Sequence, residues 1–183
     1  MYRLLFLFVL TFIMTLPSIG QTSKENDLAK KVLESFRSKD YDAYKSILAS
    51  RKDLEELFAD IQQHDDVQRP DEWKQTLEKF DQQADSTYRA KFEYILEKGE
   101  KLGIEWSKAT FTNFIFKTQK AVNSSKISLS GHINFTCNGI TYILFGLEAT
   151  ELSSGYKVNM LRTVQKGGLS EYVDPGLMDD GDI

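Results

Sequence analysis

Cysteine, proline and histidine are scarce in this chain, and their scarcity excludes several kinds of protein. Cys137 is the single cysteine, so an internal disulfide is excluded and stability has to come from the burial of apolar side chains. Cys137 follows an alternating apolar pattern, which predicts a buried and unreactive thiol. An intermolecular disulfide is the alternative.

Sequence motifs of the common catalytic and nucleotide-binding sites are also missing. The chain has no HExxH, GxSxG, P-loop or GxGxxG pattern. Neither His64 nor His132 has a second ligand at metal-binding spacing, so we expect no metal and no cofactor. His132 and Cys137 are separated by an odd number of positions in one predicted strand, which places them on opposite faces and excludes a Cys–His pair unless a bulge intervenes.

Positive charge is not concentrated anywhere in the chain. Lysine and arginine number 23 against 27 aspartates and glutamates, which gives a formal net charge of −4, and the basic residues are scattered. A mildly acidic protein without a basic cluster is poorly suited to nucleic acid or to an anionic membrane surface. We therefore expect no nucleic-acid partner.

The first 20 residues have the pattern of a secretory signal peptide. Arg3 precedes an apolar run from Leu4 to Leu16, Pro17 ends the run, and Ser18-Ile19-Gly20 places small residues at a cleavage site. The run is shorter than the ~20 residues that span a bilayer, which favours a cleaved leader, and an uncleaved anchor is the alternative. We predict removal of residues 1–20, export to the periplasm or the medium, and membrane contact only through this transient leader.

Apolar residues recur at helical spacing through the first half of the chain. The spacing predicts four helices, over approximately 25–36, 41–48, 54–61 and 71–102. Asp40 is placed to cap the second helix, and Ser50 with Asp53 matches a capping box before the third. Pro70 suits the first position of the fourth helix. Residues 62–69 are polar and aperiodic, which predicts a loop.

The second half alternates between apolar and polar residues, as β-strands do. The alternation predicts four strands, over approximately 110–118, 126–137, 140–150 and 156–164. We expect an α+β fold, in which N-terminal helices are followed by a four-stranded antiparallel meander packed on the long helix. The domain is predicted over residues 21–165, and residues 166–183 are predicted to form a flexible acidic tail.

The dipeptide Asn138-Gly139 predicts a tight hairpin turn, because a type I′ turn needs positive φ at both positions. Counting back from this two-residue loop gives the pairs Phe135–Tyr142, Ile133–Leu144, Gly131–Gly146 and Leu129–Glu148. Two opposed glycines leave a gap in side-chain cover, which predicts a bend in the sheet or room for a ligand. On this count Glu148 shares a face with Tyr142.

A candidate pocket is expected between the sheet and helical residues 88–102. Its predicted residues are His132, Tyr142, Phe145, Glu148 and Arg162. Glu148 is the carboxylate expected on an apolar face, with Arg162 as its partner, and a solvent-exposed place at the sheet rim is the alternative. For His132 the alternative is a half-buried position beside Phe145. No residue is predicted to be catalytic.

The order of elements resembles the NTF2-like/cystatin-like group of α+β domains. Residues 28–48 resemble the opening helices of such domains, with residues 36–41 as their joint, and residues 102–164 resemble the last strands. The run KLGIEWS at 101–107 resembles uncharacterised exported bacterial proteins. The early β-hairpin of NTF2-like domains is replaced by helix, and no catalytic Asp–His pair of the enzyme members can be placed here.

The resemblance implies no single activity, since this group includes enzymes, ligand binders and dimerisation modules. Aromatic-rich walls and the lack of a catalytic motif favour an exported, non-enzymatic module that binds a small apolar ligand or a protein partner. One alternative is a hydrolase or isomerase that uses Glu148, Tyr142 or His132. The other is an assembly module that forms a homodimer through its sheet.

Overall fold

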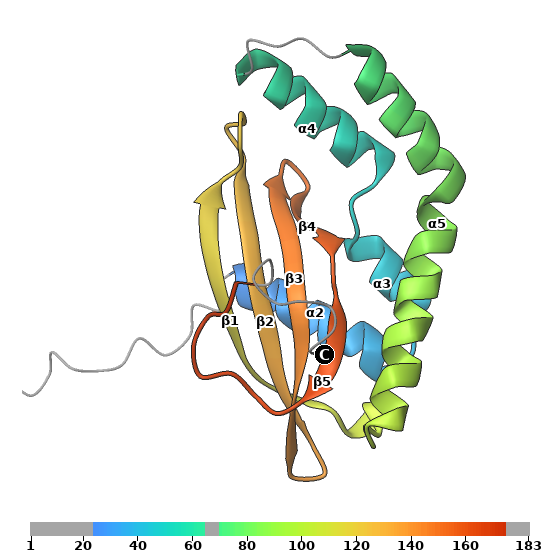
Figure 1. Cartoon of the computed structure of the whole chain (residues 1–183), viewed down its shortest axis with the longest axis vertical. Helices are drawn as coiled ribbons and strands as arrows, with labels where there is room; N and C mark the ends of the chain where they lie inside the picture. Colours follow the sequence, from blue (N-terminus) through green and yellow to red (C-terminus); the bar gives the residue numbers. More distant parts are fainter. Residues whose placement is uncertain (1–23, 65–69, 175–183) are drawn as a thin grey trace, which may run out of the picture.

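A computed structural model describes residues 24–64 and 70–174, so the predicted leader at 1–20 lies outside the described residues. Within these ranges helices come first and a β-sheet follows (Figure 1). The helices are α2 (Lys24–Arg37), α3 (Tyr41–Ile47), α4 (Arg51–His64), α5 (Pro70–Lys101) and the short 3-10 helix η1 (Trp106–Lys108). α4 continues to His64, into the segment predicted as a loop.

Side-chain caps close to the predicted residues begin helices α3 and α4. The Asp40 carboxylate accepts a hydrogen bond from the Ala43 N–H at 3.0 Å, which caps α3. Before α4, the Ser50 N–H donates to Asp53 Oδ2 at 2.9 Å and the Asp53 N–H donates to Ser50 Oγ at 3.3 Å. This reciprocal pair is the predicted capping box.

The sheet is antiparallel throughout. Its strands are β1 (Thr110–Lys120), β2 (Ile127–Cys137), β3 (Ile140–Leu152), β4 (Gly155–Met160) and β5 (Thr163–Lys166). The first four are neighbours in chain order, and β5 also pairs with β3. The strand predicted over 156–164 is thus two short strands on β3. They are separated at Leu161, which turns into the core, and Arg162, whose N–H still donates to the Phe145 carbonyl.

The predicted hairpin register is right near the turn and wrong beyond it. Asn138 and Gly139 have φ of 51° and 78°, as a type I′ turn requires. The observed pairs are Phe135–Tyr142, Ile133–Leu144, Gly131–Leu147 and Leu129–Ala149. The first two confirm the prediction, and the others correct it. The cause is a bulge at Gly146, where φ is +70° and one extra residue enters β3.

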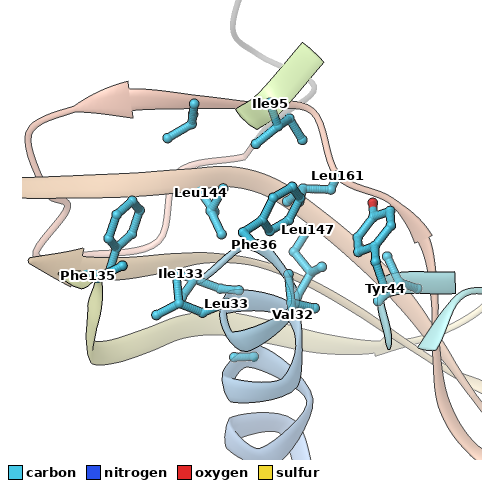
Figure 2. Packing of buried hydrophobic residues seen from close by; sticks show 14 of the residues in the cluster. Val32, Leu33, Phe36, Tyr44, Ile95, Ile133, Phe135, Leu144, Leu147 and Leu161 are labelled. Atoms are coloured by element: carbon cyan, nitrogen blue, oxygen red, sulfur yellow. The ribbon is translucent and has the colours of Figure 1, made fainter. Parts of the chain in front are cut away.

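α2 lies across one face of the sheet, here called the inner face, and supplies much of its cover (Figure 1). Val32, Leu33 and Phe36 of α2 pack toward Ile133, Leu144 and Leu147 of the sheet (Figure 2). The Phe36 ring is fully buried and lies 4.8 Å from the Phe92 ring of α5 and 5.5 Å from Trp106. Loss of such a buried ring costs ~3–5 kcal/mol, so α2 contributes substantially to the stability of the core.

α5 packs on the sheet through its C-terminal part. Phe92 and Ile95 are its buried apolar residues, and toward its N-terminal end α5 contacts α4 and α3. The Phe58 ring of α4 stacks on Trp73 of α5 at 5.5 Å. The two helices therefore form a pair that extends beyond the main core, above the ends of the strands (Figure 1).

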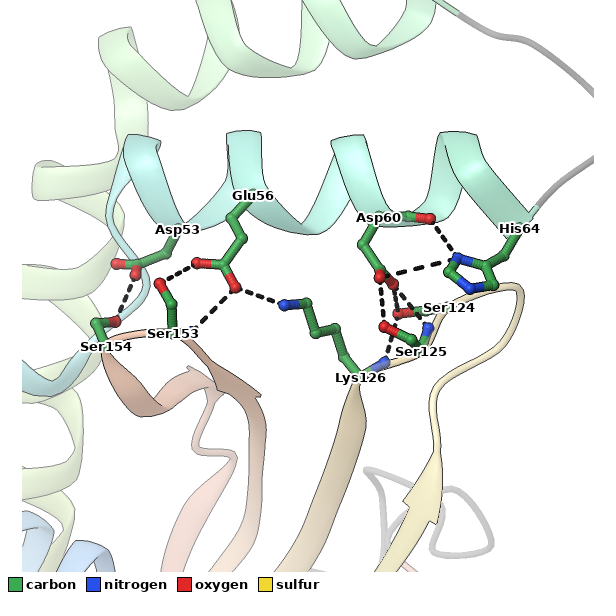
Figure 3. A network of polar contacts seen from close by, with 9 residues as sticks. All are labelled: Asp53, Glu56, Asp60, His64, Ser124, Ser125, Lys126, Ser153 and Ser154. Atoms are coloured by element: carbon green, nitrogen blue, oxygen red, sulfur yellow. Dashed lines mark hydrogen bonds and ion pairs between the residues drawn. The ribbon is translucent and has the colours of Figure 1, made fainter.

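Three acidic residues of α4, Asp53, Glu56 and Asp60, attach this pair to the sheet (Figure 3). Their partners belong to two β-turns: Ser124, Ser125 and Lys126 between β1 and β2, and Ser153 and Ser154 between β3 and β4. Asp60 accepts from the Ser124 hydroxyl at 2.5 Å and the Ser125 N–H at 2.7 Å. Burial alone would raise the pKa of Asp60, but these hydrogen bonds outweigh it and lower the pKa to about 2.

Candidate functional site

The face of the sheet opposite α2, here called the outer face, carries four of the five residues predicted for the site. The bulge at Gly146 reverses the alternation of β3, so Glu148 shares the outer face with His132 and Phe145. Arg162 lies in the β4–β5 connection, and its Nη2 is 3.6 Å from Glu148 Oε1. The aliphatic part of the Arg162 side chain covers Gly146, where a Cβ would lie 2.6 Å from Arg162 Cγ. The predicted Glu148–Arg162 pair is therefore present, although on the other face than expected.

Tyr142 is the predicted site residue that the structure places elsewhere. Its side chain is buried on the inner face, and its hydroxyl donates to the Leu102 carbonyl at 3.3 Å. The alternative of a hydrolase or isomerase site named Glu148, Tyr142 or His132 as its acting residue. The sheet separates Tyr142 from Glu148 and His132, so Tyr142 does not share a pocket with either of them.

His132 is fully buried on the outer face. Its ring stacks on Phe145 at 4.4 Å and on Tyr172 at 5.6 Å. The Gly146 N–H donates to Nδ1 at 3.2 Å, and Nε2 donates to the Val173 carbonyl at 2.5 Å, which assigns the Nε2–H tautomer. Burial lowers the pKa of this imidazole, although the bond to Val173 opposes the shift. His132 is thus a neutral ring that holds the bulge and a neighbouring segment together.

That neighbouring segment, residues 168–174, crosses the outer face after β5 and is here called the C-terminal strap (Figure 1). Asn134 binds its backbone in two directions: Nδ2 donates to the Leu169 carbonyl at 2.8 Å, and the Leu169 N–H donates to Oδ1 at 3.1 Å. The Tyr172 hydroxyl donates to Ser130 Oγ at 3.2 Å. Polar side chains at alternate positions of β2 therefore hold the strap.

Residues 166 and 168–174, which belong to the predicted flexible tail over 166–183, lie against the sheet. Lys166 ends β5, and residues 168–174 contact β2, so this part of the segment packs on the domain. Residues 175–183 lie outside the described residues.

Two hollows flank Arg162. The first, here called the helix–sheet groove, has a volume of about 450 Å³ and lies between α3, α5 and the end of β4. Its main lining residues are Tyr44, Leu48, Tyr88, Lys91, Met160, Leu161 and Arg162. It occupies the expected place between the long helix and the sheet, but Arg162 is the one predicted site residue in its lining.

The second hollow, here called the outer-face pocket, has a volume of about 400 Å³ and lies under the C-terminal strap. Its lining includes Lys117, Ser130, Glu148, Arg162 and Tyr172. The Lys117 ammonium lies 4.3 Å from the centre of the Tyr172 ring, a cation–π contact. This hollow is polar, whereas the helix–sheet groove is lined mainly by aromatic and aliphatic side chains.

Cys137 and His64 each bind a backbone carbonyl of the fold. Cys137 is buried, and its thiol donates to the Glu105 carbonyl at 3.4 Å. His64 ends α4, with Nδ1 2.7 Å from the Asp60 carbonyl. In residues 24–64 and 70–174, no three histidine, cysteine, aspartate or glutamate side chains gather as a metal site. No helix of those residues has the length and apolar character to cross a membrane.

Sequence reasoning misses most of the residues that line the two hollows. Tyr44 and Tyr88 belong to apolar helical stripes, which indicate core, and only the packing of three elements leaves them at a groove. Lys117 is one of many scattered lysines. Tyr172 lies in a segment without periodicity, so nothing local indicates that it returns to the sheet.

Comparisons with known proteins bear on the fold. No protein-family model and no curated protein matches the chain. Among solved structures, it is similar to a cystatin-like protein from Ruminococcus gnavus, with a TM-score of 0.56 and 14% sequence identity. The likeness covers 83% of this chain and 48% of that chain, so the chain spans about half of that protein's length. It confirms a cystatin-like α+β fold and says nothing of activity.

Proposed function

We propose that this protein is a non-enzymatic binding module that holds a small amphiphile in the helix–sheet groove. The ligand has an apolar body and an anionic end, as a fatty acid does. The observation that carries this proposal is a groove of about 450 Å³ in which an apolar wall meets two cationic residues. Its size lies within the ~300–1,000 Å³ range of small-ligand sites.

The apolar wall supports the first half of the proposal. Tyr44, Leu48 and Leu161 are buried beneath the groove, and Tyr88 is partly buried. Met160 is 45% exposed, so an apolar side chain is left in water at the mouth. An unbranched thioether adapts to ligands of different shape, and covering it removes apolar surface from water.

The charge of the lining supports the second half. Lys91 and Arg162 line the groove, and its lining contains no carboxylate. Lys91 Nζ donates to the Arg162 carbonyl at 2.8 Å and has no ion pair within the described residues. An ammonium with three donors and one backbone acceptor can still donate to a ligand carboxylate. An anionic head group at this end is therefore favoured over a neutral or cationic one.

The test compares three ligands with one tail. Dodecanoate, dodecanol and dodecyltrimethylammonium are titrated below their micelle concentrations, with thermal unfolding and calorimetry as readouts. We expect dodecanoate to bind most tightly and to raise Tm. If none of the three raises Tm, or the cationic detergent binds as well as dodecanoate, the proposal fails.

Two variants locate the site. Lys91→Gln should weaken dodecanoate binding about tenfold, the equivalent of one charge-assisted hydrogen bond, and leave dodecanol binding unchanged. Lys74→Gln, on an exposed turn of the same helix, is the matched control. Met160→Asp should weaken the binding of both dodecanoate and dodecanol. Equal effects of the two lysine variants would place binding outside the groove.

We also propose that the module works outside the cytoplasm. The support is the leader pattern at residues 1–20. N-terminal sequencing of the protein recovered from its own host tests this. A mature chain that begins near residue 21 is expected, and a cytoplasmic protein that retains Met1 would refute it.

A further inference from the structure

The outer-face pocket is a second hollow that the proposed amphiphile does not use. It lies on the opposite side of the sheet from the α2 layer and is closed on one side by the C-terminal strap. Five separate segments contribute side chains to it, namely β1, β2, β3, the end of β4 with its following link, and the strap. A polar hollow assembled from so many segments needs a ligand or water to satisfy its groups.

Both signs of charge line this pocket, and they are loosely paired. The Arg162 guanidinium is 3.6 Å from Glu148, beyond hydrogen-bond length, and the buried Arg162 Nε has no partner. Lys117 contacts the Tyr172 ring and has no carboxylate partner within the described residues. Lysines paired elsewhere on this protein lie as close as 2.6 Å to their carboxylates. The charges of Lys117, Arg162 and Glu148 are therefore available to a ligand.

The combination of groups selects a class of ligand. A phosphate would meet Lys117 and Arg162 but would also be repelled by Glu148 and Asp174. A sugar usually stacks on a free aromatic face, and the Tyr172 ring already contacts Lys117 and His132. A molecule that carries one carboxylate and one ammonium satisfies both signs at once.

We propose that the outer-face pocket binds a small zwitterion of the free amino acid class. The ligand carboxylate is held by Lys117 and Arg162, for which a guanidinium offers two parallel donors. The ligand ammonium is held by Glu148, and the Ser130 hydroxyl is within the same lining. Tyr172 covers the site, because the strap carries it across the outer face.

This inference does not rest on the proposed amphiphile site. Arg162 lines both hollows, but through different parts: its carbonyl accepts from Lys91 on the groove side, and its guanidinium faces Glu148. Lys117 and Glu148 line the outer-face pocket alone. Variants at these two positions therefore separate the two proposals.

The test uses three small molecules that differ by one charge. L-Alanine, propionate, which lacks the ammonium, and ethylamine, which lacks the carboxylate, are titrated into the ¹⁵N-labelled full chain, and the Arg162 Nε–H resonance is followed. We expect saturable shifts with L-alanine and about tenfold weaker binding of each single-charge analogue. If L-alanine binds no better than propionate, or moves no resonance, the proposal is wrong.

Three variants complete the experiment. Lys117→Gln and Glu148→Gln should each weaken the binding of L-alanine about tenfold. Glu148→Gln should strengthen the binding of propionate, because a like charge is removed. Lys120→Gln, exposed on the same strand as Lys117 and outside the lining, should change nothing. Equal losses in the two lysine variants would refute the site. Dodecanoate binding should be unchanged in Lys117→Gln, so failure of either proposal is visible separately.

Discussion

Replacement of Asp60 by asparagine should weaken the attachment of α4 to the sheet. The carboxylate receives hydrogen bonds from the Ser124 hydroxyl and the Ser125 N–H, and its side chain is 12% exposed (Figure 3). Asp60→Asn keeps the shape but removes the charge and turns one acceptor oxygen into a donor amide. The Ser125 hydroxyl also donates to this carboxylate, so three donors then lose a charged acceptor.

The size of the effect follows from the pKa of Asp60. The fall from 3.8 to about 2 corresponds to ~2 kcal/mol of folding free energy at neutral pH, because each pKa unit is worth about 1.36 kcal/mol. The folded pKa lies below the unfolded one, so this contribution is complete above about pH 5 and is lost as pH falls toward 2. At pH 3 roughly half of it remains.

Urea unfolding of the wild type and Asp60→Asn at pH 7, 5 and 3 measures this contribution. Glu55→Gln is the control on the same helix. Within residues 24–64 and 70–174 this exposed residue pairs only with Arg51, at i,i+4, and its replacement should cost less than about 0.5 kcal/mol. Hydrogen exchange should locate the change in α4. The reasoning is refuted if Asp60→Asn costs no more than Glu55→Gln at pH 7, or if its cost is as large at pH 3 as at pH 7.

Two further predictions concern the bulge and its histidine. Gly146→Ala should lower the free energy of unfolding by ~1–3 kcal/mol, because φ is +70° and the new Cβ would lie 2.6 Å from Arg162 Cγ. Gly155→Ala is the control: its φ is +99°, but the space around it is open, so it should lower the free energy of unfolding less. Thermal unfolding decides, and equal losses would show that contact with Arg162 contributes nothing. The His132 ring should titrate below 6.5 by NMR and keep the Nε2–H tautomer at neutral pH. Because the pKa of His132 is lower in the folded than in the unfolded protein, the free energy of unfolding should decline as pH falls below 6.5. Titration of this ring at the ordinary histidine pKa would contradict the burial of His132.

Local features of the fold could be predicted because their causes lie within a few residues. The capping box of Ser50 and Asp53 and the type I′ turn at Asn138-Gly139 depend on side-chain hydrogen bonds or φ preferences at fixed spacing. The helix and strand periodicities are equally local. Their order alone predicts the cystatin-like α+β arrangement that the solved structure shares.

The candidate site was predicted only in part, and Gly146 is the reason. A glycine within a strand is compatible with a bend or a bulge, and the sequence does not distinguish them. The bulge moves Glu148 from the face of Tyr142 to that of His132, since one extra residue reverses the alternation. His132 and Phe145 are neighbours without that shift, whereas the Glu148–Arg162 pair joins them on the outer face only because of it.

The sequence by itself determined the type, order and approximate bounds of the helices and strands, because periodicity and capping act over a few residues. The tertiary structure decided which faces meet. It placed α2 across the inner face, brought Tyr172 and Val173 back to His132, and left two hollows on either side of Arg162. These outcomes depend on packing between segments far apart in the chain, for which no short stretch of sequence carries the information.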